Sequence, residues 1–127
     1  MNKKILVVDD EIGIRESLQK ILGKEGFSVE TASNGDEAFK ILRRGGIDLL
    51  ITDIRMAGMD GVELLKVCKS VSPFTEVIII TGYASVDTAV DSMKQGAYDY
   101  ITKPFKKADI LKAVNKAIEK QILTMDN

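Results

Sequence analysis

Short apolar segments alternate with longer segments of helical periodicity along the whole chain. The apolar segments, at residues 4–8, 27–32, 48–52, 76–81 and 98–102, have the length and β-branched character of buried strands. Each is followed by a stretch in which apolar residues recur every three or four positions. Strands that are apolar throughout and are separated by amphipathic helices predict a parallel sheet covered on both faces. The expected fold class is therefore a doubly wound α/β domain.

Capping signals mark the expected helix boundaries. Asn34 with Glu37, and Asp60 with Glu63, have the spacing of residues that begin a helix. Glycines are expected to end three helices, namely Gly23 or Gly26, then Gly45–Gly46, then Gly96. Three helices carry an apolar stripe that we expect to face the sheet: Ile14, Leu18, Ile21 and Leu22; Val86, Ala89, Val90 and Met93; and Ile110, Val114, Ala117 and Ile118.

Composition narrows the class of protein further. A chain of 127 residues with 45% hydrophobic and 29% charged residues is typical of one globular domain, which we place at residues 1–121. Residues 122–127 are expected to be a tail or the start of a linker. The net charge of −1 provides no basic surface, so we expect no direct binding of nucleic acid. The single Cys68, the absence of a signal-peptide pattern and the lack of a long apolar run favour a cytoplasmic protein with no membrane contact.

Polar residues of particular types follow four of the predicted strands. Asp9 and Asp10 follow the first strand, Asp53 the third, Thr81 the fourth and Lys103 the fifth. In doubly wound sheets the ligand site lies beyond the carboxyl ends of the strands. Because the chain has no histidine, chemistry at such a site must use carboxylates, hydroxyls, lysine or a cofactor.

The strand order decides whether these residues meet. Two orders are common for such sheets; in the order 2-1-3-4-5 the first and third strands are neighbours, so Asp9, Asp10 and Asp53 converge. Two carboxylates about 4 Å apart repel by roughly 4 kcal/mol at an effective dielectric constant near 20, so the cluster favours a proton or a cation. Mg²⁺ suits oxygen ligands and keeps waters that a phosphate oxygen can replace. With Lys103 and Thr81 nearby, such a site would accept a phosphoryl group on Asp53.

Each residue also has a purely structural interpretation. Asp9 and Asp10 could cap the first helix, Asp53 could begin a turn, Thr81 could simply end a strand, and Lys103 could be a solvated surface charge. The occurrence of all the required residue types at four strand ends favours the site.

The whole chain resembles the receiver domains of two-component response regulators. The resemblance rests on "VVDDE" after the first strand, the loop D-x-x-M-x-G-M-D-G, a strand ending T-G and a final strand ending K-P-F. It implies a flavodoxin-like (βα)5 sheet of order 2-1-3-4-5. It further implies that Asp9 and Asp10 bind Mg²⁺ beside Asp53 and the backbone carbonyl of Arg55, and that Asp53 is the phosphoacceptor. Thr81 would then move to the phosphoryl group, Lys103 would pair with it across a cis Lys103–Pro104 bond, and Tyr100 would turn inward.

The resemblance also implies partners and an output. A sensor histidine kinase, or a small acyl phosphate, would supply the phosphoryl group, and the domain would catalyse its own phosphorylation and dephosphorylation rather than act as an enzyme on other substrates. The surface at about 83–118 would change, serve as a homodimer contact and control transcription through an effector domain absent from this chain. The stretch from Thr81 to Phe105 further resembles NtrC-like regulators of sigma-54 RNA polymerase. Ala57 stands where the family's loop usually has proline, which predicts a less rigid loop.

Three other functions fit the sequence less well. A hydrolase that forms an aspartyl phosphate would need an acid two residues after Asp53, where this chain has Arg55. A nucleotide or flavin carrier would need a glycine-rich turn after the first strand, where this chain has acids. A pseudo-receiver that takes no phosphate would not need the full set of acids, threonine and lysine.

Overall fold

The computed structural model describes residues 2–125, in which five strands alternate with five helices. The elements are β1 (Lys4–Val8), α1 (Ile12–Lys24), β2 (Ser28–Ala32), α2 (Gly35–Arg44), β3 (Leu49–Thr52), α3 (Gly61–Val71), β4 (Glu76–Thr81), α4 (Val86–Lys94), β5 (Asp99–Thr102) and α5 (Lys107–Met125). The five predicted strands are therefore confirmed. The expected tail at 122–127 overlaps the end of α5, and its residues 126–127 lie outside the described part.

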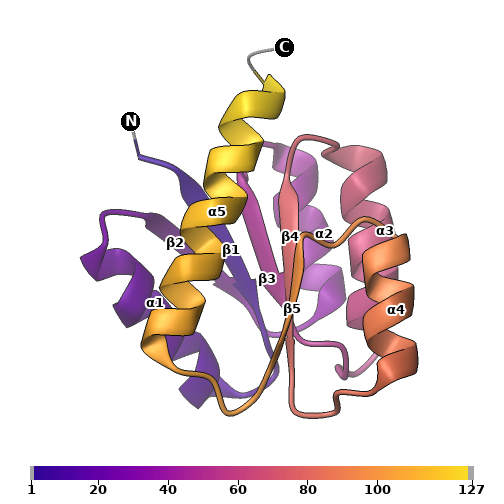
Figure 1. The fold of residues 1–127 in the computed structure, drawn as a ribbon. Coiled ribbons are helices and arrows are strands. Elements are labelled where there is room, and N and C mark those ends of the chain that lie inside the picture. Colours follow the sequence, from indigo (N-terminus) through magenta and orange to yellow (C-terminus); the bar gives the residue numbers. More distant parts are fainter. Residues whose placement is uncertain (1, 126–127) are drawn as a thin grey trace.

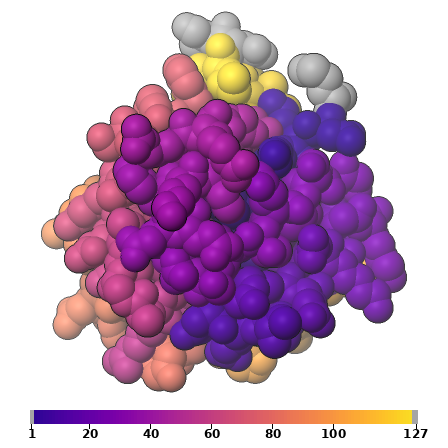
Figure 2. Space-filling view, turned by 180° about the vertical axis from the view of Figure 1, so that it is seen from behind, coloured from indigo at the N-terminus to yellow at the C-terminus, as the bar shows by residue number. Residues whose placement is uncertain are grey.

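The strands form one parallel sheet in the order β2-β1-β3-β4-β5. Helices α1 and α5 cover one face, and α2, α3 and α4 cover the other (Figure 1). Figure 2 shows this second face from behind, where residues in the colours of α2 and α3 form much of the surface. The predicted doubly wound fold and its strand order are both confirmed, and they place β1 and β3 side by side.

The core consists of two apolar layers separated by the sheet. Ile5 and Val7 point to the layer shared with α1 and α5, while Leu6 and Val8 point to the layer shared with α2 and α3. This alternation is the two-residue period of a strand, and both sets are buried because helices cover both faces. A rigid central strand therefore leads directly to Asp9.

The predicted helix boundaries agree with the structure. The side chain of Asn34 accepts a hydrogen bond from the Glu37 amide at 2.8 Å, and Asp60 accepts one from the Glu63 amide at 2.9 Å. After α1 it is Gly26, with φ of 92°, that takes the left-handed conformation. In the part of the chain that is described, no helix is long and apolar enough to cross a membrane.

The predicted orientation of α4 is wrong. The stripes of α1 and α5 do face the sheet, but Val86 is 79% exposed and Val90 and Met93 are each 47% exposed. The inward side of α4 is polar instead, with Ser92 fully buried and Thr88 bonded to the Tyr100 hydroxyl at 2.7 Å. Periodicity places Val86, Ala89, Val90 and Met93 on one side of the helix, but it does not say which side the sheet covers. The edge strand β5 is only half-buried and gives α4 little apolar surface to cover.

Candidate functional site

Four acidic side chains gather at the carboxyl ends of β1 and β3. One carboxylate oxygen from each of Asp9, Asp10, Glu11 and Asp53 lies within 4.8 Å of the others. Asp9 and Asp53 are only 2% and 3% exposed, whereas Asp10 and Glu11 are open to solvent. The structure thus brings together the three aspartates that the sequence analysis selected, because their strands are neighbours.

Lys103 reaches this cluster from the turn after β5. Its Nζ donates hydrogen bonds to Asp9 Oδ2 at 2.8 Å and to Asp53 Oδ2 at 2.9 Å, and it lies 3.5 Å from Glu11 Oε1. The Lys103 backbone amide is held by the Thr81 carbonyl at 2.9 Å. The Lys103–Pro104 peptide bond is cis, as the resemblance implied. The ammonium group is therefore fixed between the two most buried acids.

The charges in the cluster are only partly balanced. Burial raises the pKa of Asp9, although hydrogen bonds from Lys103 and from the Glu11 amide act in the opposite direction. Burial alone would lower the pKa of Lys103, but its hydrogen bonds with Asp9 and Asp53 dominate and raise it. Lys103 is therefore charged at neutral pH and faces several carboxylates with one positive charge. An oxygen-rich site with excess negative charge fits a hard divalent cation such as Mg²⁺.

Backbone contacts fix the Asp53 carboxylate. Its Oδ1 accepts hydrogen bonds from the amides of Ile54 at 2.6 Å and Arg55 at 3.4 Å, which leaves Oδ2 to face Lys103. Gly61 supports the same segment: its amide donates to the Ile54 carbonyl at 2.8 Å, and a Cβ on Gly61 would collide with the Asp53 carbonyl oxygen. Sequence analysis did not assign Gly61 this role, because it depends on how closely α3 approaches the end of β3.

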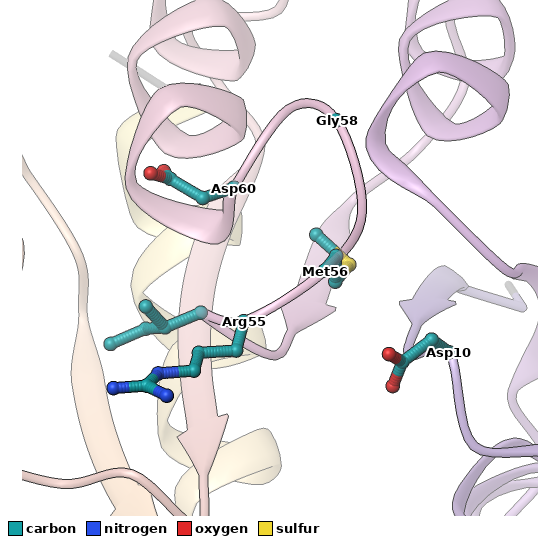
Figure 3. A pocket seen from close by; sticks show the side chains of 6 residues that line it. Asp10, Arg55, Met56, Gly58 and Asp60 are labelled. Atoms are coloured by element: carbon teal, nitrogen blue, oxygen red, sulfur yellow. The ribbon is translucent and has the colours of Figure 1, made fainter.

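The cluster opens into a cavity of about 550 Å³. The cavity is lined by Asp10, Ile54, Arg55, Met56, Gly58 and Asp60. Figure 3 shows Asp10 on one side and the β3–α3 loop on the other, with the Arg55 guanidinium group pointing away from Asp10. That group stacks on the ring of Tyr83 in the β4–α4 loop, 4.2 Å from the ring centroid. The sequence analysis did not foresee this contact, since it joins two loops that are far apart in the sequence.

Thr81 and Tyr100 belong to the neighbouring strands β4 and β5. Thr81 is fully buried at the end of β4, and its Oγ1 accepts a hydrogen bond from the Tyr83 amide at 3.1 Å. Tyr100 is half-buried and its hydroxyl pairs with Thr88 of α4. Ala57 is an exposed residue of the β3–α3 loop. The site can thus hold a cation, place a carboxylate oxygen at an open cavity and offer a lysine to an anionic group.

Comparison with known proteins identifies the family of the chain. Residues 5–115 match the response regulator receiver domain. Over 100 residues the chain is 49% identical to the transcriptional regulatory protein ZraR of Klebsiella oxytoca. The aligned residues make up 79% of this chain and 23% of that protein. Over 116 residues it is 40% identical to the sporulation initiation phosphotransferase F of Bacillus subtilis, covering 91% of this chain and 94% of that one.

Solved structures agree with the sequence comparison. The solution structure of the beryllofluoride-activated NtrC4 receiver domain dimer superposes with a TM-score of 0.89 at 40% identity, covering 93% of this chain and 98% of that one. The chain thus spans about a quarter of the length of ZraR and nearly all of phosphotransferase F. Because the family model matches residues 5–115, this chain belongs to the response regulator receiver domain family.

Proposed function

We propose that Asp53 accepts a phosphoryl group from a sensor histidine kinase and that the domain catalyses this transfer itself. The observation that carries the proposal is the Asp53 carboxylate, fixed by backbone amides through Oδ1 and by Lys103 through Oδ2, in a cluster with Asp10, which lines an open cavity. An Asp53 oxygen forms the new bond to phosphorus. The bond from phosphorus to the donor breaks, and its electron pair leaves with the imidazole of a phosphohistidine or with the carboxylate of an acyl phosphate.

The charged neighbours of Asp53 take complementary parts in this transfer. Asp9, Asp10, Asp53 and the Arg55 carbonyl would hold Mg²⁺, which when bound neutralises charge on the phosphoryl oxygens. Lys103 already lies 2.9 Å from Asp53 Oδ2 and is placed to move its hydrogen bond to a phosphoryl oxygen. The Lys103 ammonium lies between Asp9 and Asp53, so it needs little movement to stabilise the negative charge that the phosphoryl group adds to Asp53.

Thr81 and Tyr100 would convert the phosphoryl group into a change of surface. For Thr81 to approach the phosphoryl group it must leave the Tyr83 amide, and for Tyr100 to turn inward it must leave Thr88. Reversing an equilibrium from 1:99 to 99:1 takes about 5.5 kcal/mol. Two or three charged hydrogen bonds of about 1.5 to 3 kcal/mol each are of the right size. The affected surface is α4, β5 and the part of α5 up to residue 118, at about residues 83–118.

That surface is also the proposed contact for a homodimer and for output. The exposed side chains of Val86, Val90 and Met93 support a contact there, and the NtrC4 relative was solved as a dimer. The names of the relatives support transcription regulation of an NtrC-like kind. The sigma-54-dependent route and the effector domain are part of our proposal. We place the receiver at residues 1–121, its tail or linker at 122–127, and the protein in the cytoplasm.

Incubation with Mg²⁺ and acetyl phosphate, followed by intact mass measurement, tests the phosphoacceptor. We expect one phosphoryl adduct per chain, absent in Asp53→Asn and in EDTA. Asp60→Asn is a matched control, because Asp60 lines the same cavity and asparagine can also cap α3. An adduct on Asp53→Asn would refute the assignment, and steady release of phosphate from unrelated phosphoesters would favour the hydrolase instead.

A further inference from the structure

The loop between β3 and α3, at residues 53–60, forms most of the wall of the acidic cavity. Apart from Asp10, the residues that line the cavity all belong to this loop. The same loop carries the backbone carbonyl of Arg55, the proposed ligand of Mg²⁺ beside Asp10 and Asp53. The position of that carbonyl is therefore only as well defined as the course of the loop.

The loop has little rigidity of its own. At its base the Gly61 amide donates to the Ile54 carbonyl at 2.8 Å, which closes residues 54–61 into a ring. Its crest includes Gly58, which has a φ of 78° and is preceded by Ala57 (Figure 3). Neither residue fixes the backbone as a proline ring at position 57 would. The crest therefore depends on support from outside the loop.

Helix α2 supplies that support through Gly35, its first residue. Gly35 is buried, and a Cβ built on it would lie 2.8 Å from both the Cβ and the carbonyl oxygen of Met59. The start of α2 thus approaches the loop so closely that no side chain fits between them. Gly35 is not among the glycines with positive φ, so the close approach, and not the backbone conformation, requires glycine here.

The start of α2 is itself firmly fixed. The Asn34 side chain caps the helix by accepting a hydrogen bond from the Glu37 amide at 2.8 Å, and the Asn34 carbonyl accepts one from the Ala38 amide at 3.1 Å. Ala38 is fully buried in the apolar layer against which Met59 also packs. A capped helix end that is packed into the core is a rigid surface against which the loop can rest.

We propose that Gly35 is a positioning residue for the Mg²⁺ site. It lets the rigid start of α2 hold Met59, and the held loop keeps the Arg55 carbonyl beside Asp10. This inference rests on the proposed function of Asp53 with bound Mg²⁺. A side chain at position 35 would push Met59 away from α2. Because Met59 follows Arg55 by four residues in a loop that is closed at its base, the displacement reaches the Arg55 carbonyl.

The choice of cation distinguishes this role from a general loss of structure. Mg²⁺ demands near-ideal octahedral geometry with ligand distances of about 2.0 to 2.1 Å, whereas Ca²⁺ accepts irregular geometry at about 2.3 to 2.6 Å. A slightly displaced carbonyl should therefore weaken the binding of Mg²⁺ more than the binding of Ca²⁺. A partly unfolded variant would instead lose affinity for both cations together.

Titration with each cation, followed by amide chemical shifts, tests the proposal. We expect Gly35→Ala to weaken Mg²⁺ binding by about fivefold to twentyfold and Ca²⁺ binding by less than about threefold. Met59→Gly removes the same contact from the loop side and is expected to show the same selectivity. Because both variants act through one contact, the double variant should bind Mg²⁺ no more weakly than the weaker single one. Gly23→Ala is the matched control, since a Cβ on this glycine of α1 meets nothing within 4 Å.

The rate of phosphorylation by acetyl phosphate provides a second measurement. In Gly35→Ala the Mg²⁺ concentration that gives the half-maximal rate should rise by the same factor as the dissociation constant of Mg²⁺. The rate at saturating Mg²⁺ should stay within about twofold of the wild-type rate, because the variant changes cation binding and not the Asp53 carboxylate. In the wild type, the contact itself should give nuclear Overhauser effects between the α protons of Gly35 and the β protons of Met59.

The outcomes separate the role of Gly35 from the proposed function. Equal losses of Mg²⁺ and Ca²⁺ affinity in Gly35→Ala, an unchanged Mg²⁺ affinity, or the absence of the Overhauser effects in the wild type would overturn the role of Gly35 and leave the phosphoacceptor intact. If Gly35→Ala does not fold, the cation selectivity of Met59→Gly decides in the same way. A wild-type chain that neither binds Mg²⁺ nor forms the adduct would refute the proposed function and, with it, the role of Gly35.

Discussion

At the scale of single residues, the site combines a fixed cation with acids that it cannot fully neutralise. Lys103 lies between Asp9 and Asp53, yet burial still raises the pKa of Asp9. A raised pKa of a carboxyl means that its charged form is less stable in the folded protein than in the unfolded chain. The residue that is proposed to bind a cation therefore lowers the stability of the cation-free protein, which is a common cost of functional sites.

We predict that Asp9→Asn raises the free energy of unfolding in EDTA at pH 7 by about 0.5 to 2 kcal/mol. The folded protein binds the Asp9 proton more tightly than the unfolded chain does, so the protonated Asp9 carboxyl stabilises the fold at acidic pH. This stabilisation is lost as the pH rises through the raised pKa of Asp9. The advantage of Asp9→Asn should therefore shrink as the pH is lowered, as measured by urea unfolding. The control is Glu16→Gln, which removes the same negative charge from an exposed side chain. A lower free energy of unfolding for Asp9→Asn in EDTA would contradict the prediction.

At the scale of elements, features that depend on local sequence were predicted better than features that depend on tertiary contacts. The strands, the caps at Asn34 and Asp60, and the inward stripe of α5 follow from short-range sequence patterns, and the structure confirms them. The convergence of the site acids followed from strand order alone. The orientation of α4 and the close approach of Gly61 depend on what packs against each element. Such contacts leave no periodic signal in one sequence.

A pair of identical substitutions tests the orientation of α4. We expect Val90→Ala to change the free energy of unfolding by less than about 0.5 kcal/mol, because an exposed valine loses little contact and alanine favours helix. Val114→Ala in α5 should cost about 2 kcal/mol, since Val114 is 1% exposed and its truncation leaves a cavity. Urea unfolding of the two variants gives the comparison. Equal losses would mean that α4 buries its apolar side in solution.

At the scale of the whole molecule, the site and the end of α5 lie at opposite edges of the sheet. The acids follow the carboxyl ends of the strands, whereas the last turns of α5 reach the amino ends (Figure 1). There the buried Gln121 donates to Asp48 Oδ1 at 3.0 Å, and Lys120 binds both oxygens of the buried Glu76 at 3.0 and 3.1 Å. These polar contacts fix the direction in which α5 leaves the domain, independently of the contacts at the acidic cluster.

Because the two edges are separate, we predict that Lys120→Met weakens the polar contacts at the end of α5 without affecting the site. Glu76 is 2% exposed and, among residues 2–125, would keep only Lys69, at 3.9 Å, as a cation. We expect a loss of about 1 to 2 kcal/mol in the free energy of unfolding, a modest value because Lys120 itself is 53% exposed. Amide hydrogen exchange should rise in residues 119–125, while the yield of the phosphoryl adduct stays at the wild-type level. Lys116→Met, an exposed lysine of the same helix, is the control. If Lys120→Met, but not Lys116→Met, lowered the adduct yield, the two edges of the sheet would be coupled through α5. If Lys120→Met left the free energy of unfolding unchanged, Glu76 would not depend on Lys120.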